Sequence, residues 1–144
     1  AFPDAPGQLE AGSIDAAWVP DPFMSMVANG DGLIVVHPYQ VTVPGISLLT
    51  NITTQRLIDE DPELVEAYAA AMAEALDWAQ ANPDAVRAAI VENMGIPEAA
   101  AAGITLPVFT AEIDEGKLDE LAGLAVEFGV LDQKPDFSKL LALQ

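Results

Sequence analysis

The sequence predicts an α/β protein, in which a partial parallel sheet is followed by a helix-rich C-terminal region. Short apolar runs separated by helix-length spacers predict the sheet, because parallel strands need crossover connections of this kind. Pairs of a capping residue and a proline, at residues 61–62 and 82–83, predict the later helices. Of the 144 residues, 51% are hydrophobic and 19% are charged, which is typical of a folded globular chain.

The strands of the sheet are predicted from apolar runs in the first third of the chain. Residues 14–19 are apolar apart from Asp15, and residues 33–36 are apolar throughout, so both are expected to be buried. Residues 46–52 form a further extended run. Because prolines bracket residues 39–43, that segment is expected to be a crossover and not a continuous helix.

Helices are predicted between these runs and along the rest of the chain. Most have a capping residue or a proline at the start, and several have a glycine at the end. After Pro62 the apolar residues Leu64, Tyr68 and Met72 recur at helical spacing. The predicted helices cover residues 4–12, 23–28, 54–58, 62–79, 83–94, 97–102, 115–128 and 137–141.

The balance between strands and helices is uneven. A parallel sheet needs helices on both of its faces, and each helix needs an apolar surface to cover. The few strands predicted here form too small a sheet surface to be covered by all the helices that follow. We therefore expect another piece of chain, absent from this sequence, to supply the remaining strands.

The chain is strongly acidic, with a net charge of −18. Its five scattered basic residues cannot form the basic face that nucleic-acid binding requires, so nucleic acid is excluded as a partner. An acidic lipid surface is expected to repel the chain. The charge indicates a solvated acidic surface, or an adaptation to high salt or an acidic exterior. With no cysteine, the chain offers neither a thiol nucleophile nor a thiolate metal site, and its single histidine cannot build a metal site without carboxylate partners.

Ordered stretches along the chain carry a resemblance to a known family. Residues 9–23, LEAGSIDAAWVPDPF, resemble the L-x-x-G-x-[IV]-D-A-x-x-x-x-[ED]-P stretch of the NMT1/THI5-like and SsuA/TauA-like solute-binding proteins. Two later helices and the ending of that family have counterparts here in the same order. The residues that match them are 61–68, 75, 78, 82–85, 128–131 and 135–137.

This resemblance implies part of a type II periplasmic-binding-protein fold, which has two α/β lobes with the ligand held between them. The sequence would be the C-terminal half of such a protein. Residues 1–42 would belong to the second lobe, and residues 43–53 would form the hinge crossover. Residues 54–144 would be a helical region packed on the first lobe, whose N-terminal part is not in this sequence.

The function that the resemblance implies is capture of a small molecule by lobe closure and delivery to the permease of an ABC importer. The protein would be extracytoplasmic and not an enzyme, and no cofactor is implied. Ligands of the family include sulfonates, taurine, nitrate, thiamine-pyrimidine precursors and riboflavin-like compounds. The acidic chain favours a neutral or cationic heterocycle among them.

Two alternative functions remain open. One is an enzyme of the same fold that makes the thiamine pyrimidine, although this sequence has no cysteine for the Cys-rich motif of such enzymes. The other is a non-catalytic helical interaction module. If a lobe is absent, the apolar surface left behind would also favour self-association.

The predicted ligand-binding residues follow the first apolar run or lie on the crossover. Asp15 either faces the ligand or is held by backbone N–H groups, and Trp18 either stacks on a ligand ring or belongs to the core. Asp21 is alternatively a helix cap. No catalytic residue and no metal ligand is predicted. The predicted ligand-binding residues are Asp15, Trp18, Asp21, Tyr39 and Thr42.

Overall fold

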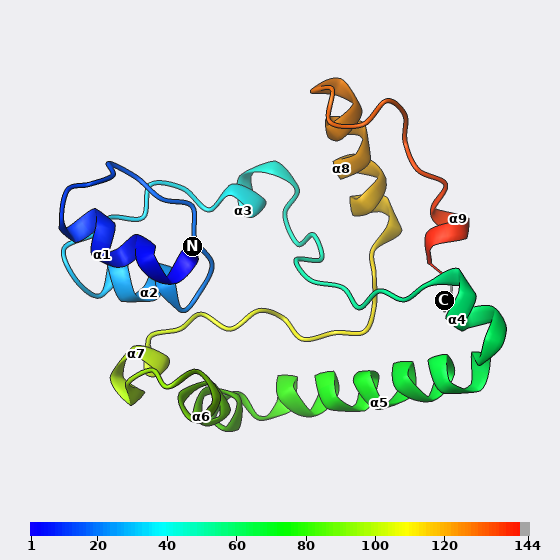
Figure 1. The fold of residues 1–144 in the computed structure, drawn as a ribbon, viewed down its shortest axis with the longest axis horizontal. Coiled ribbons are helices and arrows are strands. Elements are labelled where there is room, and N and C mark those ends of the chain that lie inside the picture. Colours follow the sequence, from blue (N-terminus) through cyan, green and yellow to red (C-terminus); the bar gives the residue numbers. More distant parts are fainter. Residues whose placement is uncertain (142–144) are drawn as a thin grey trace. The chain divides into compact units, whose positions relative to one another are not determined.

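The structure is a computed structural model that describes residues 1–141, and helices dominate it (Figure 1). Helix accounts for 57% of these described residues and strand for 0%. The chain divides into two compact units. The first unit comprises residues 1–35 and 78–109, and the second comprises residues 36–77 and the described residues from 110 onward.

The first unit is built from short helices around a small core. A 3₁₀ turn, η1 (Phe2–Asp4), leads into α1 (Ala5–Glu10), which packs against α2 (Phe23–Ala28). Helix α6 (Pro83–Met94) packs against α7 (Glu98–Ala102). The buried residues of this unit are Ala5, Pro22, Ser25, Ala101 and Ile104.

The second unit contains the remaining helices and most of the longest one. Helices α3 (Pro38–Thr42) and α4 (Gln55–Glu60) precede α5 (Pro62–Ala81), whose last turn belongs to the first unit. Helices α8 (Glu115–Glu127) and α9 (Phe137–Leu140) follow. The buried residues of this unit are Val43, Ile46, Val65 and Ala122.

The capping chemistry predicted from the sequence is confirmed at some helix boundaries, whereas Asn82, the residue predicted to cap α6, makes no side-chain cap hydrogen bond. The Thr54 hydroxyl accepts a hydrogen bond from the Leu57 N–H at 3.2 Å, so it caps α4. The Asp114 carboxylate accepts from Lys117 N–H at 3.1 Å and caps α8 in the same way. At the other end of α6, Gly95 has a φ of 66°, the left-handed conformation that ends many helices. The predicted helix-rich C-terminal region is therefore confirmed through α9.

The predicted parallel sheet, and with it the α/β fold of the periplasmic-binding-protein type, is wrong for the described residues. Residues 14–19, 33–36 and 46–52 adopt no regular structure. A strand is stable only when a neighbouring strand satisfies its backbone N–H and C=O groups, and β-rich composition cannot replace that neighbour. The expected burial fails with the sheet, since Leu33 and Ile52 are 89% and 92% exposed.

The prediction of a non-helical crossover between the prolines is also wrong. Residues Pro38–Thr42 form α3, with Pro38 at the first helical position. Its missing N–H costs nothing there, because the first N–H groups of a helix have no intrahelical partner. His37 has φ −101° and ψ 94°, the extended geometry favoured before a proline. The Val43 N–H donates to the Tyr39 carbonyl at 3.1 Å and closes the helix.

Candidate functional site

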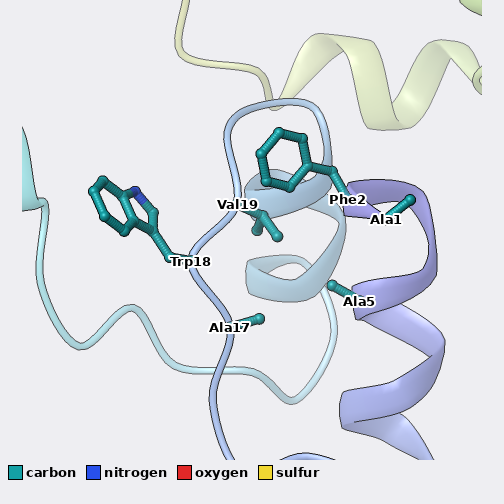
Figure 2. Close-up of a pocket in the computed structure, with 6 residues that line it drawn as sticks. All are labelled: Ala1, Phe2, Ala5, Ala17, Trp18 and Val19. Carbon is teal, nitrogen blue, oxygen red and sulfur yellow. The ribbon is translucent and has the colours of Figure 1, made fainter.

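An apolar pocket lies at the start of the chain, around Trp18. Its volume is about 530 Å³, within the range of small-molecule sites. No side chain of its lining carries a charge. In Figure 2 the Phe2 ring extends toward Val19, and the Trp18 indole lies on the opposite side of Val19 from Ala1 and Ala5. We call this cavity the Trp18 pocket, and its lining residues are Ala1, Phe2, Ala5, Ala17, Trp18 and Val19.

Two segments separated in sequence meet in this pocket because the chain reverses after α1. Gly12 has a φ of 66°, a conformation that glycine adopts without steric cost. The Gly12 N–H donates to Leu9 O at 3.0 Å, and the Ser13 N–H donates to Gln8 O at 2.9 Å. These bonds end the helix and direct residues 14–19 back toward η1, so that both segments contribute to the lining.

The loop that carries Trp18 is anchored at its far end by a part-buried hydrogen-bond network. The Asp21 carboxylate accepts from the backbone N–H of Ser25 at 3.1 Å and also from the Ser25 hydroxyl. The Ser25 oxygen lies 3.3 Å from the carbonyl oxygen of Gly103. Ser25 is only 6% exposed, so this network joins α2 to the end of α7 inside the first unit.

Of the predicted ligand-binding residues, Trp18 alone lines this pocket. Its side chain is 68% exposed, so the alternative in which Trp18 belongs to the core is wrong. Asp21 accepts a hydrogen bond from the Ser25 N–H in α2, but the N-cap position of that helix is Pro22 and not Asp21. Asp15 lies exposed in the loop, so it is not the buried strand carboxylate that was expected. A ligand contact by either carboxylate stays a prediction.

The other predicted residues belong to the second unit. Tyr39 lies in α3 and is 49% exposed. Thr42 is the last residue of the same helix and is also exposed. A helix places these residues three positions apart, close to one another along one face. Their contact with a ligand stays a prediction.

Comparison with known proteins identifies the family. The sequence profile of the NMT1-like family matches residues 1–95. The chain belongs to the NMT1-like family. No curated protein and no solved structure matches the chain. The family assignment confirms the NMT1/THI5-like resemblance, and the matched region of this NMT1-like chain contains the whole Trp18 pocket and the Asp21 carboxylate.

A second pocket in this NMT1-like chain was missed by the sequence analysis. It has a volume of about 390 Å³ and is formed by the end of α5, the first turns of α6 and residues 104–109. Arg87 is the basic residue in its lining, and we call it the Arg87 pocket. In the sequence Arg87 is an isolated cation of an amphipathic helix. The only hint is its position five residues after the Asn82-Pro83 helix start, which is too common to indicate a site.

Within residues 1–141 the structure shows neither a cluster of metal-ligand side chains nor a membrane-spanning helix. No three His, Cys, Asp or Glu side chains of this part of the chain gather closely enough to hold a metal ion. None of its helices combines the length and the apolar character needed to cross a membrane. The lining of the Trp18 pocket itself offers apolar contact and aromatic stacking.

Proposed function

We propose that this chain is the ligand-capturing portion of a non-catalytic solute-binding protein, which works outside the cytoplasm and passes its ligand to an ABC permease. The observation that carries the proposal is the Trp18 pocket, an apolar cavity of about 530 Å³ in the part of the chain that matches the NMT1-like family. Two aromatic side chains of its lining, Phe2 and Trp18, are 55% and 68% exposed.

The lining favours binding over catalysis. Alanine, valine, phenylalanine and tryptophan side chains supply no nucleophile, general acid or general base. An apolar ligand surface would be removed from water by this lining, and an aromatic ring would gain stacking on Trp18. The pocket thus has the chemistry to hold a molecule without changing it.

The ligand class that fits this lining is a neutral, ring-bearing compound such as a pyrimidine or a related heterocycle. The Trp18 pocket has no positively charged side chain that could bind a small anion such as nitrate or a sulfonate. Such an anion would also approach a chain with a net charge of −18. The family's anionic ligands are therefore disfavoured at this site.

The proposal is tested by calorimetric titration of the chain with neutral heterocycles, sulfonates and nitrate. We expect a neutral heterocycle to bind, and Trp18→Ala to weaken its binding roughly threefold to tenfold, the usual contribution of one aromatic pair. The matched control is Trp78→Ala, because Trp78 is 55% exposed but lies outside the Trp18 pocket. Equal losses in both variants, or preferential binding of the anions, would contradict the proposal.

The transport role needs a cellular measurement. Cells that lack the parent protein are expected to lose uptake of the labelled ligand, and the wild-type gene is expected to restore it. A gene that carries Trp18→Ala is expected to restore uptake only partly. Recovery of the label as a chemically altered product made by the purified protein would favour the enzyme alternative instead.

A further inference from the structure

The Arg87 pocket contains a guanidinium whose hydrogen-bonding capacity is poorly used. Its Nη1 lies 3.5 Å from the Asp84 carboxylate, and its Nη2 donates to the Ile104 carbonyl at 3.4 Å. Both distances exceed the 2.7–3.2 Å of ordinary N–H···O hydrogen bonds. The Nε–H is shielded from solvent and has no hydrogen-bond partner among the described residues.

Other cations of the chain are held more closely by carboxylates. Arg56 lies 2.6 Å from Glu60, and Lys134 lies 2.7 Å from Asp119. Arg87 differs from both because its carboxylate partner, Asp84, is fully solvent-exposed at the long distance given above. A buried donor without an acceptor is unfavourable, so an acceptor that reached the Nε and Nη2 edge of Arg87 would be stabilised there.

The rest of the pocket lining carries both polar and apolar groups. The side-chain oxygen of Gln80 accepts from the Phe109 N–H at 2.8 Å, so the Gln80 amide nitrogen remains as a donor. Thr105 contributes a hydroxyl, and Ile104 and Leu106 contribute apolar surface. The cavity of about 390 Å³ holds a small molecule of several heavy atoms.

We propose that the Arg87 pocket binds a small monocarboxylate with a short aliphatic tail. The carboxylate would take the Nε and Nη2 edge of Arg87 in a bidentate pair, the geometry that guanidinium and carboxylate favour. Because the Nε–H is shielded in this structure, the guanidinium would have to turn out of its 3.4 Å contact with the Ile104 carbonyl for the carboxylate to reach it. Gln80 or Thr105 donates to the same carboxylate, and the tail lies against Ile104 and Leu106.

One guanidinium sets the charge of the ligand. Arg87 can neutralise a single negative charge, while Asp84 beside it and the net charge of −18 oppose any further one. A dicarboxylate or a phosphate dianion is therefore rejected. The site shares no lining residue with the Trp18 pocket and does not depend on the proposed function.

The test is an NMR titration of the ¹⁵N-labelled chain with butyrate, with butyramide as the neutral isostere and succinate as the dianion. Butyrate is expected to shift the Arg87 Nε–H and the amide signals of residues 104–109 in a saturable way. Arg87→Gln is expected to weaken butyrate binding roughly tenfold or more, as expected for the loss of a charged hydrogen bond. Arg56→Gln is the matched control and is expected to leave the affinity for butyrate unchanged.

The wild-type Nε–H signal reports on the site even if Arg87→Gln disturbs the packing of α6 on α7. Two results would overturn the proposal. One is a butyrate titration in which butyramide shifts the same signals equally, because the charge would then play no part. The other is a shift of Arg56 as large as that of Arg87, because butyrate would then be an unspecific counterion of surface cations.

Discussion

The hydroxyl of Ser25 is buried and connects α2 to the Asp21 carboxylate and to the Gly103 carbonyl, so its removal should have a measurable effect. Ser25→Ala removes the hydrogen bond from the hydroxyl to the Asp21 carboxylate and leaves that carboxylate with the backbone N–H of Ser25 at 3.1 Å. It also removes the 3.3 Å contact with the Gly103 carbonyl, which joins α2 to α7.

The magnitude follows from the type of bond. A hydrogen bond to a charged acceptor contributes about 1.5–3 kcal/mol. Asp21 is only half-buried and regains water when the hydroxyl is lost, so the lower end applies, about 1.5 kcal/mol. Because 1.4 kcal/mol is a factor of ten, the amides of α2 and α7 are expected to exchange with solvent roughly tenfold faster.

Hydrogen exchange read by NMR measures this effect separately in each unit. The matched control is Ser138→Ala, which removes the same type of bond, from a serine hydroxyl to Asp136 at 2.7 Å. Both residues of that pair are exposed and lie in the second unit, so exchange in α2 and α7 should not change. The reasoning is refuted if Ser25→Ala leaves exchange in α2 and α7 at the wild-type rate.

Three further outcomes are expected. In urea unfolding, Gly45→Ala should lower the stability of the chain more than Gly12→Ala does. Both glycines have a positive φ, which an alanine adopts only with strain. At Gly45 the new Cβ would also displace Lys117 Nζ from its 3.3 Å hydrogen bond to the Gly45 carbonyl. The pKa of Asp136 lies below its ordinary value of 3.8, chiefly because the Ser138 side chain donates a hydrogen bond to it. The stabilisation that the Asp136 carboxylate gives to α9 is therefore present above pH 3.8 and is lost as the pH falls through the lowered pKa. Ser138→Ala should raise this pKa in a ¹³C NMR titration. Added NaCl should raise the unfolding temperature, because screening of the −18 charge outweighs the loss of exposed ion pairs; a fall would contradict this.

The helices were predictable because their signals are local. Asp114 and Gly95 fix the start of α8 and the end of α6 through bonds to residues a few positions away. The strands were not predictable, because a strand depends on a neighbouring strand that is often distant in the sequence. Leu33 and Ile52 are apolar residues of the kind found in sheets, yet each remains exposed without a ladder in the described residues.

The candidate site was predictable in part for the same reason. Trp18 stands out as an aromatic residue after an apolar run, and the structure places it in the pocket lining. Phe2 gives no such signal, because it lines the same pocket as Trp18 only once the chain has reversed at Gly12. Arg87 was seen only as a scattered cation, since its pocket depends on the packing of residues 104–109 against α6.

The central claim is that the Trp18 pocket binds a neutral ring compound and returns it unchanged. The most direct measurement is a calorimetric titration of the chain with the tightest heterocycle, followed by mass spectrometry of the recovered ligand. The account predicts saturable binding that Trp18→Ala weakens and Trp78→Ala does not, with the ligand recovered at its original mass. Binding that is indifferent to Trp18, or a ligand recovered at a different mass, would contradict it.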